Sequence, residues 1–293
     1  MLITKTHHDI KASNGTIRIF VISPVIQGYP EAKFPGVVVF SEIYQVTGPV
    51  ERFAGQIASQ GYVVACPSSY HEFVGPEPLA YDTEGTDLGN KLKIEKEVAA
   101  YDEDATLSVD LLVSLPNCTG RVAATGMCLG GHLAFRVCAF HLHPSKIVSL
   151  SAHIPNQAAF DPRVLASVCF FATDIHSRTL GKGKNDDSLA RVERGDLSDG
   201  RTELVMIFGK QDTHVPRAGR DLIRKTLEDS NVIFSLLEVQ AQHAFIRDEH
   251  SKGRWDAALT KSCFNFMMEV FDRTVARDLG KHVPVSGEIK HVC

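Results

Sequence analysis

The 293-residue chain lacks the cysteine patterns of disulfide-rich and zinc-binding proteins, because its seven cysteines are odd in number and no two form a C-x-x-C pair. A disulfide framework or a zinc knuckle is therefore not expected. We expect reduced thiols and a cytoplasmic protein. The chain also has no excess of positive charge, since 31 Lys and Arg residues stand against 35 Asp and Glu residues. This balance excludes the basic surface that a nucleic-acid or anionic-membrane partner requires.

Long hydrophobic runs are missing as well. The longest uncharged stretch, residues 53–70, contains Gln, Ser, Gly and Pro, so we expect no membrane-spanning segment. The first 15 residues include no apolar core of a secretory signal. Apolar residues make up 44% of the chain and charged residues 23%, which is typical of globular proteins.

What the chain does have is a regular alternation of short apolar segments and helical segments. This alternation predicts an α/β fold with a mostly parallel central sheet and helices on both faces. We expect a single domain over residues 1–293, with its core at about residues 16–272. The predicted strands are residues 16–23 (an edge strand), 35–41, 62–66, 121–125, 146–151, 203–209 and 232–239, and the predicted helices are residues 48–60, 91–115, 129–140, 215–227 and 255–272.

Residues 173–201 interrupt this rhythm, because they are rich in charge and glycine and have no clean period. A loop this long in a compact domain is usually functional or mobile. We interpret it as an insertion, either a lid over a site or a solvated surface segment. The last residues, 278–293, are expected to form a loosely held tail.

The strongest chemical signal is the segment from Gly126 to Gly131, which reads G-M-C-L-G-G between a predicted strand and a predicted helix. Gly126 and Gly130 flank Cys128 in the G-x-Nu-x-G pattern of a nucleophile elbow. The flanking residues must lack side chains because strand and helix approach closely in such a turn. The following helix N-terminus favours a thiolate, so the sequence also predicts a reactive Cys128.

Two further residues follow predicted strands and complete a nucleophile, base and acid set. Asp212 follows the strand at residues 203–209, and His243 follows the strand at residues 232–239. This order of nucleophile, acid and histidine suits the elbow topology. Asp212 could instead cap the next helix, and an isolated His243 could be a surface residue. His214 is a rival for the base, although we expect it to lie on the surface.

Glu42 directly follows the strand at residues 35–41, where a buried carboxylate is costly and needs a reason. It could be a solvated loop residue. Alternatively, it contacts Cys128 and takes part in its ionisation. In that case the N–H groups of Ile43 and Leu129 would form an oxyanion hole, in which one donor is typically worth about 10²- to 10³-fold in rate.

Together, the segments S-E-I-Y (residues 41–44), G-M-C-L-G-G, D-T-H-V-P (residues 212–216) and H-A-F (residues 243–245) resemble the dienelactone hydrolase family of the α/β-hydrolase superfamily. The resemblance implies a Cys-His-Asp triad of Cys128, His243 and Asp212, with Glu42 holding the resting thiol. It implies no metal and no organic cofactor. It also implies that Arg247 contacts a substrate carboxylate, and we expect Tyr44 to line the same site. Glu72 stands about where the family has a second arginine, and its charge would repel a carboxylate.

We therefore predict a hydrolase that cleaves a lactone, ester or thioester of a small organic substrate. Two alternatives stay open from the sequence. The same site could carry out ring opening, cyclisation or C–C cleavage, or the fold could serve a non-catalytic binding protein. A monomer or a homodimer is expected, with no nucleic-acid or membrane partner.

Overall fold

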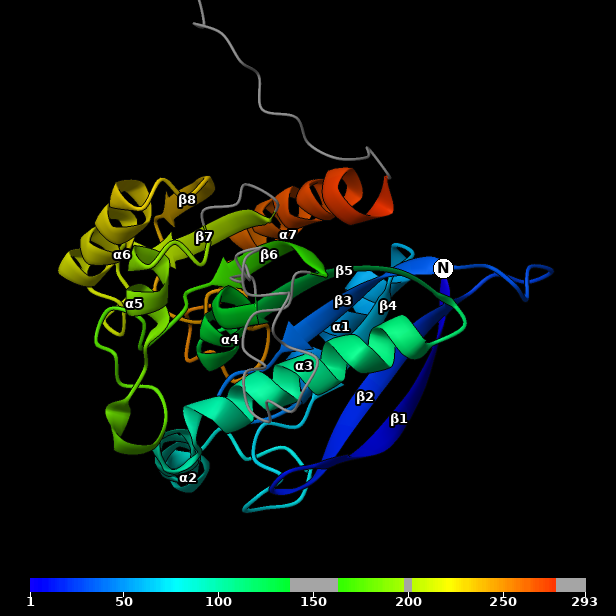
Figure 1. Ribbon diagram of the computed structural model, residues 1–293, viewed down its shortest axis with the longest axis horizontal. Helices are drawn as coiled ribbons and strands as arrows, with labels where there is room; N and C mark the ends of the chain where they lie inside the picture. Colours follow the sequence, from blue (N-terminus) through cyan, green and yellow to red (C-terminus); the bar gives the residue numbers. More distant parts are fainter. Residues whose placement is uncertain (138–162, 198–201, 278–293) are drawn as a thin grey trace, which may run out of the picture.

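The computed structural model describes residues 1–137, 163–197 and 202–277, and its centre is a mixed sheet of eight strands (Figure 1). The order of the strands is β1-β2-β4-β3-β5-β6-β7-β8. β1 and β2 run antiparallel to each other and β2 to β4, whereas the other neighbours are parallel. This confirms the predicted fold class. The strands are β1 (Leu2–Ala12), β2 (Gly15–Val25), β3 (Phe34–Phe40), β4 (Val63–Pro67), β5 (Cys118–Met127), β6 (Val164–Phe170), β7 (Glu203–Gly209) and β8 (Phe234–Val239).

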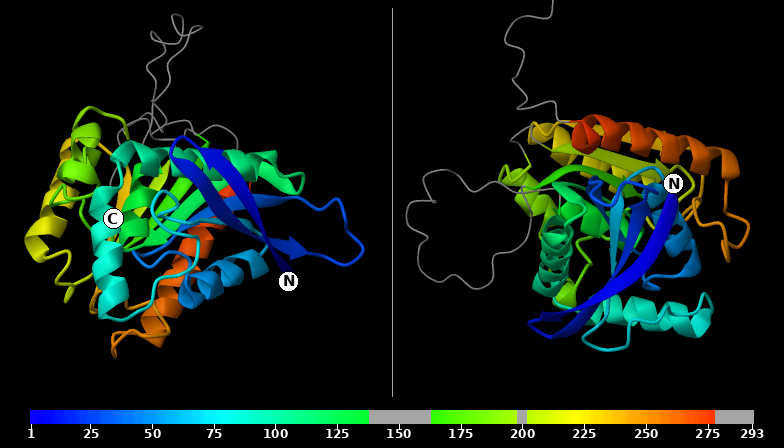
Figure 2. Two further views of the ribbon diagram at one scale, coloured as in Figure 1. Left: turned by 90° about the horizontal axis from the view of Figure 1, so that it is seen from below. Right: turned by 90° about the vertical axis from the view of Figure 1, so that its right-hand side faces the viewer.

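Helices cover both faces of the sheet, as a strand buried on both sides requires. α1 (Gly48–Ser59) and α7 (Ala257–Phe271) pack on one face, while α3 (Val98–Ser114), α4 (Leu129–Val137) and α6 (Arg217–Asp229) lie on the other (Figure 2). The sequence of β3 is continuously apolar because both faces of this strand are buried. Val37 and Val39 join the core beneath α1 and α7, and Val38 joins the core beneath α3 and α4.

The sheet edge differs from the prediction, because β1 pairs along the whole of β2 and is itself the edge strand. Nearly every residue of β1 is exposed or half-buried. A strand that buries neither face has no alternating apolar pattern, so periodicity could not detect it.

The helix predicted over residues 91–115 is two helices, α2 (Thr83–Glu95) and α3. Lys96 separates them with an extended backbone, and its ammonium group is buried against Glu72 and Asp104. β6 was not predicted, and the strand predicted over residues 146–151 lies outside the described residues.

Residues 173–197 pack against the rest of the fold. They contain a 3₁₀ turn, η2 (Lys182–Lys184), and the short helix α5 (Ser188–Glu193), and Leu180 and Leu189 are buried in the core. Arg136 of α4 anchors the segment through ion pairs with Asp186 and Asp187. Residues 198–201 and the predicted tail, residues 278–293, lie outside the described residues.

Candidate active site

Cys128 lies in the tight turn between β5 and α4, where the sequence predicts a nucleophile. Its backbone has a φ of +59°, in the left-handed region that residues with a side chain rarely adopt. Such a conformation costs about 1–3 kcal/mol and persists only where the surroundings enforce it. The Cys128 N–H donates to the carbonyl of Phe170 over 3.1 Å, which ties the turn to the end of β6.

The glycines around Cys128 are required by close packing of the backbone. A Cβ atom at Gly130 would collide with the carbonyls of Phe40 and Ser41, and one at Gly126 would collide with the carbonyl of Gly130. The end of β3 therefore lies directly against the first turn of α4. This is the steric reason for the glycine spacing.

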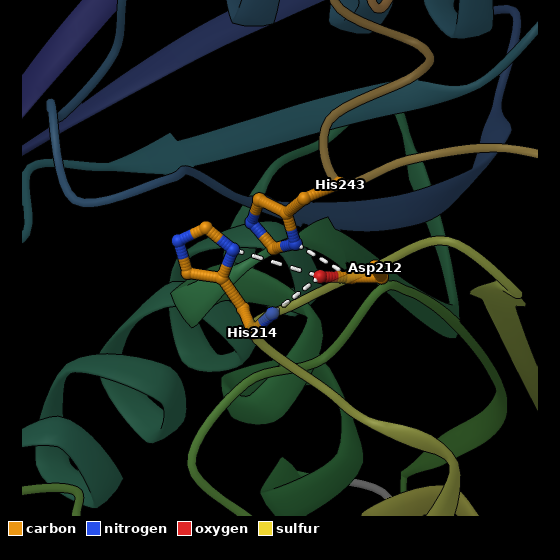
Figure 3. A group of neighbouring side chains, drawn as sticks. All are labelled: Asp212, His214 and His243. Carbon is orange, nitrogen blue, oxygen red and sulfur yellow. Dashed lines mark hydrogen bonds and ion pairs between the residues drawn. The ribbon is translucent and has the colours of Figure 1, made fainter.

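Asp212 and His243 are joined as the sequence predicts. The Asp212 Oδ2 atom lies 2.7 Å from the His243 Nδ1 atom, and both side chains are buried (Figure 3). Burial alone would raise the pKa of Asp212, but hydrogen bonds with His214 and His243 hold that pKa well below its ordinary value. Burial lowers the pKa of His243, although the Asp212 carboxylate opposes this effect. The imidazole is therefore neutral near pH 7 and able to accept a proton.

His214 is exposed at the surface, as expected, and it also contacts Asp212 and His243. Its side chain is 54% exposed, yet its ring stacks on that of His243 with centroids 4.2 Å apart. The His214 N–H donates to Asp212 Oδ1 over 2.8 Å, and the His214 Nδ1 atom lies 3.6 Å from the same oxygen (Figure 3).

Most of the predicted site residues lie around one cleft, which has a volume of about 190 Å³. Glu42, Cys128 and His243 all line this cleft, and Asp212 lies behind His243. The residues follow β3, β5, β7 and β8, whose carboxyl ends meet at one edge of the parallel part of the sheet. Binding sites in open α/β sheets lie at this edge. Cys128 is partly exposed to the cleft, in contrast to the buried cysteines Cys66, Cys118, Cys169 and Cys263.

The thiol is not activated at rest, which differs from the prediction based on the helix N-terminus. Burial, followed by the nearby charge of Glu42, raises the pKa of the Cys128 thiol to about 12. Lys93 and a hydrogen bond from the Leu129 N–H act in the opposite direction but are outweighed. Desolvation disfavours the thiolate more than the helix terminus favours it.

We expect iodoacetamide at about pH 7.5 to alkylate Cys128 roughly 100-fold more slowly than an ordinary cysteine. The thiolate fraction is far smaller, although a thiolate of high pKa is more nucleophilic. Glu42→Gln removes a charge that disfavours the thiolate, so this variant should react faster. Peptide mapping of the alkylation rate between about pH 7 and 10 checks this. Fast alkylation of the native protein with a midpoint below about pH 7 would contradict the raised pKa.

Glu42 is buried at the end of β3 and is compensated by two partners. The Arg247 Nη1 atom lies 3.3 Å from Glu42 Oε2, and the Tyr81 hydroxyl donates to the same oxygen over 3.2 Å. The Arg247 guanidinium lies 4.4 Å from the centre of the Tyr81 ring, and Thr47 hydrogen-bonds the Tyr81 hydroxyl. These contacts supply the reason that a buried carboxylate needs at this position.

Other predicted residues lie in two different places. Ile43, Tyr44 and Arg247 line the cleft, and Leu129 is the first residue of α4. Glu72 does not line the cleft: its carboxylate lies 2.7 Å from the ammonium group of Lys96. The prediction that Glu72 repels a substrate carboxylate is therefore wrong. Glu72 lies away from the cleft, and Lys96 compensates its charge.

Sequence reasoning missed several residues of the site. Tyr81 lies in a segment without periodic signal. Thr173 and Asp174 follow β6, the strand that was not predicted, and Asp174 pairs with Lys93 across the cleft wall. Thr173 Oγ1 lies 4.0 Å from the Cys128 sulfur. A strand predicted at residues 164–170 would have indicated both residues, just as the strands predicted at residues 203–209 and 232–239 indicated Asp212 and His243.

No helix within the described parts of the chain combines the length and apolar character needed to span a membrane.

The chain is similar to proteins of one known family. The model of the dienelactone hydrolase family matches residues 22–148. A protein of Saccharomyces cerevisiae named "Putative carboxymethylenebutenolidase" is 55% identical over 296 residues, covering 100% of both chains.

Two solved structures are similar in fold. The structure titled "Putative Dienelactone Hydrolase" from Klebsiella pneumoniae has a TM-score of 0.67 and 16% identity, covering 93% of this chain and 100% of that one. A dienelactone hydrolase-like promiscuous phosphotriesterase from metagenomic libraries has a TM-score of 0.65 and 17% identity, covering 93% and 99%. At these identities the two structures show a shared architecture.

Proposed function

Because the chain belongs to the dienelactone hydrolase family, it is a hydrolase of ester bonds, and we propose that it uses Cys128, His243 and Asp212 to cleave a small lactone, ester or thioester. One observation carries the proposal. The strained turn presents the thiol to the same cleft that the Asp212-bound imidazole lines. A nucleophile, a base and a group that orients the base are what acyl transfer through a covalent intermediate requires.

In the resting enzyme the thiol is protonated, since burial and Glu42 disfavour the thiolate. His243 accepts the thiol proton on its second nitrogen while Nδ1 keeps its hydrogen bond to Asp212. Glu42 assists when the substrate loosens its ion pair with Arg247. A resting thiol that ionises only on substrate binding is protected from adventitious alkylation and oxidation.

The thiolate then attacks the substrate carbonyl and forms a tetrahedral intermediate. The N–H groups of Leu129 and Ile43 stabilise its oxyanion. Collapse of the intermediate breaks the ester bond, and His243 donates its proton to the leaving oxygen or sulfur. Water activated by His243 attacks the acyl-thioester, which regenerates the thiol and releases the acid.

The substrate is small. The cleft volume of about 190 Å³ is below the size of a typical drug-sized pocket. Tyr44 and Arg247 contribute an aromatic face and a cation to its wall. The name of the yeast relative, a carboxymethylenebutenolidase, fits a lactone with an acidic side group, and the position of Glu72 offers no electrostatic objection to such a substrate.

A panel of a lactone, an aryl ester and a thioester in heavy-oxygen water tests the proposed reaction. Each turnover should place one labelled oxygen in the carboxylate product, because the acyl-enzyme is released by water. Ring opening, cyclisation or C–C cleavage without hydrolysis would release product without label. Mass spectrometry of the product distinguishes the two outcomes. If none of the three substrate classes were turned over, the proposal would be contradicted.

A further inference from the structure

Asp212, His214 and His243 bring together more metal-binding groups than the proposed reaction requires. Each offers one ligand atom, and these atoms all lie within 4.8 Å of one another. Two imidazoles and one carboxylate are a donor set that suits Zn²⁺. From this arrangement we propose that a zinc ion binds to Asp212, His214 and His243 and inhibits the enzyme reversibly.

Zinc binding would require the three ligand atoms to shift relative to one another. Zinc–ligand bonds of about 2.0–2.1 Å place tetrahedral donors about 3.3 Å apart, so no pair of these ligand atoms has to close by more than about 1.5 Å. Asp212 is held by the N–H groups of His214 and Val215, whereas the ring of His214 is half-exposed and stacks on that of His243. The His214 and His243 rings both line the cleft, which leaves the fourth zinc position open to water.

A second group of similar composition shows why this one is suited to a cation. His71, Glu72 and Asp104 also bring three ligand atoms within 4.8 Å. There, however, the ammonium group of Lys96 already lies against Glu72 and Asp104 and neutralises them. Among the described residues, the ion-pair contacts of Asp212 are with His214 and His243, and no ammonium or guanidinium lies within bonding distance of it.

Zinc at this position would remove the base from the reaction. A metal that binds the His243 imidazole and Asp212 prevents the proton transfer from Cys128, so turnover stops until the ion leaves. The zinc is thus an inhibitor and not a cofactor. The inhibition rests on the proposed role of His243, whereas the binding does not.

Isothermal titration of ZnCl₂ into the chelator-treated full chain tests the binding. His214→Phe keeps an aromatic ring beside His243 but removes a ligand, so the zinc Kd should rise at least about 10-fold. His8→Ala removes an exposed histidine from β1 and should leave the Kd unchanged. Cys128→Ser should also bind zinc as the native chain does. An unchanged Kd in His214→Phe, or loss of binding in Cys128→Ser, would overturn the site.

Activity measurements then test the inhibition. Zinc should inhibit hydrolysis of an aryl ester by the native chain, EDTA should restore the rate, and His214→Phe should raise the inhibitory concentration by the same factor as the Kd. Mg²⁺, which prefers oxygen ligands, should have no effect at equal concentration. Zinc that binds at this site without slowing turnover would overturn the inhibition, and it would do so by contradicting the role of His243.

Discussion

Cys128→Ala should lower kcat/KM for an aryl ester by about 10⁴- to 10⁶-fold. Removal of the nucleophile of a catalytic triad leaves only binding and oxyanion stabilisation, which preserve a small part of the rate. The alanine fills the same turn with one heavy atom fewer, and Cys128 is partly exposed, so the fold should be kept. Steady-state kinetics measure the loss, and thermal unfolding measures the stability.

The matched control is Cys118→Ala at the other end of β5. Cys118 is buried and does not line the cleft, so its removal should cost some stability and leave kcat/KM within about twofold of the native value. Native activity in Cys128→Ala, or an equal loss in both variants, would contradict the assignment of the nucleophile.

Asp212→Asn should lower kcat by about 10⁴-fold while the loop keeps its structure. The amide oxygen can replace Oδ1, which accepts the N–H groups of His214 and Val215. The amide nitrogen then faces His243 Nδ1, where Asp212 Oδ2 now lies 2.7 Å away. A donor at this position forces the His243 proton onto the other nitrogen, and the imidazole can no longer accept the proton of the Cys128 thiol.

Two further variants separate this effect from a structural one. Asp256→Asn changes the same residue type at the N-cap of α7 and should leave activity unchanged. Asp212→Ala should lose the loop hydrogen bonds as well, and we expect it to unfold at a lower temperature than Asp212→Asn. If Asp212→Asn retained more than about a tenth of native kcat, the carboxylate would not orient the base.

The parts of the fold that could be predicted from the sequence are those that bury apolar side chains on a regular period. β3, β7 and the elbow at Cys128 were predicted because their strands are continuously apolar and their turn is marked by glycines. Asp212 and His243 were predicted at one edge of the sheet for the same reason, because each follows an apolar strand. β1 was missed because it buries neither face, and the break at Lys96 was missed because a long-range ion pair determines it.

The electrostatics of the site could not be predicted for a related reason. The pKa of Cys128 depends on how deeply the thiol is desolvated and on its distance from Glu42, and neither is a property of local sequence. Likewise, Glu42 meets Tyr81 and Arg247 from segments 39 and 205 residues away. The sequence identified which groups could react, but the state in which they rest depends on contacts between distant segments.

The covalent intermediate provides the most direct test of the central claim. The native chain is mixed with an aryl ester whose acyl group is released slowly, quenched in acid within the first turnover, digested and analysed by mass spectrometry. We predict one acyl group per chain, on the peptide that contains Cys128 and removable by hydroxylamine as a thioester. Hydrolysis that leaves Cys128 unmodified, or an acyl group on another residue, would contradict a mechanism in which this thiol attacks the substrate.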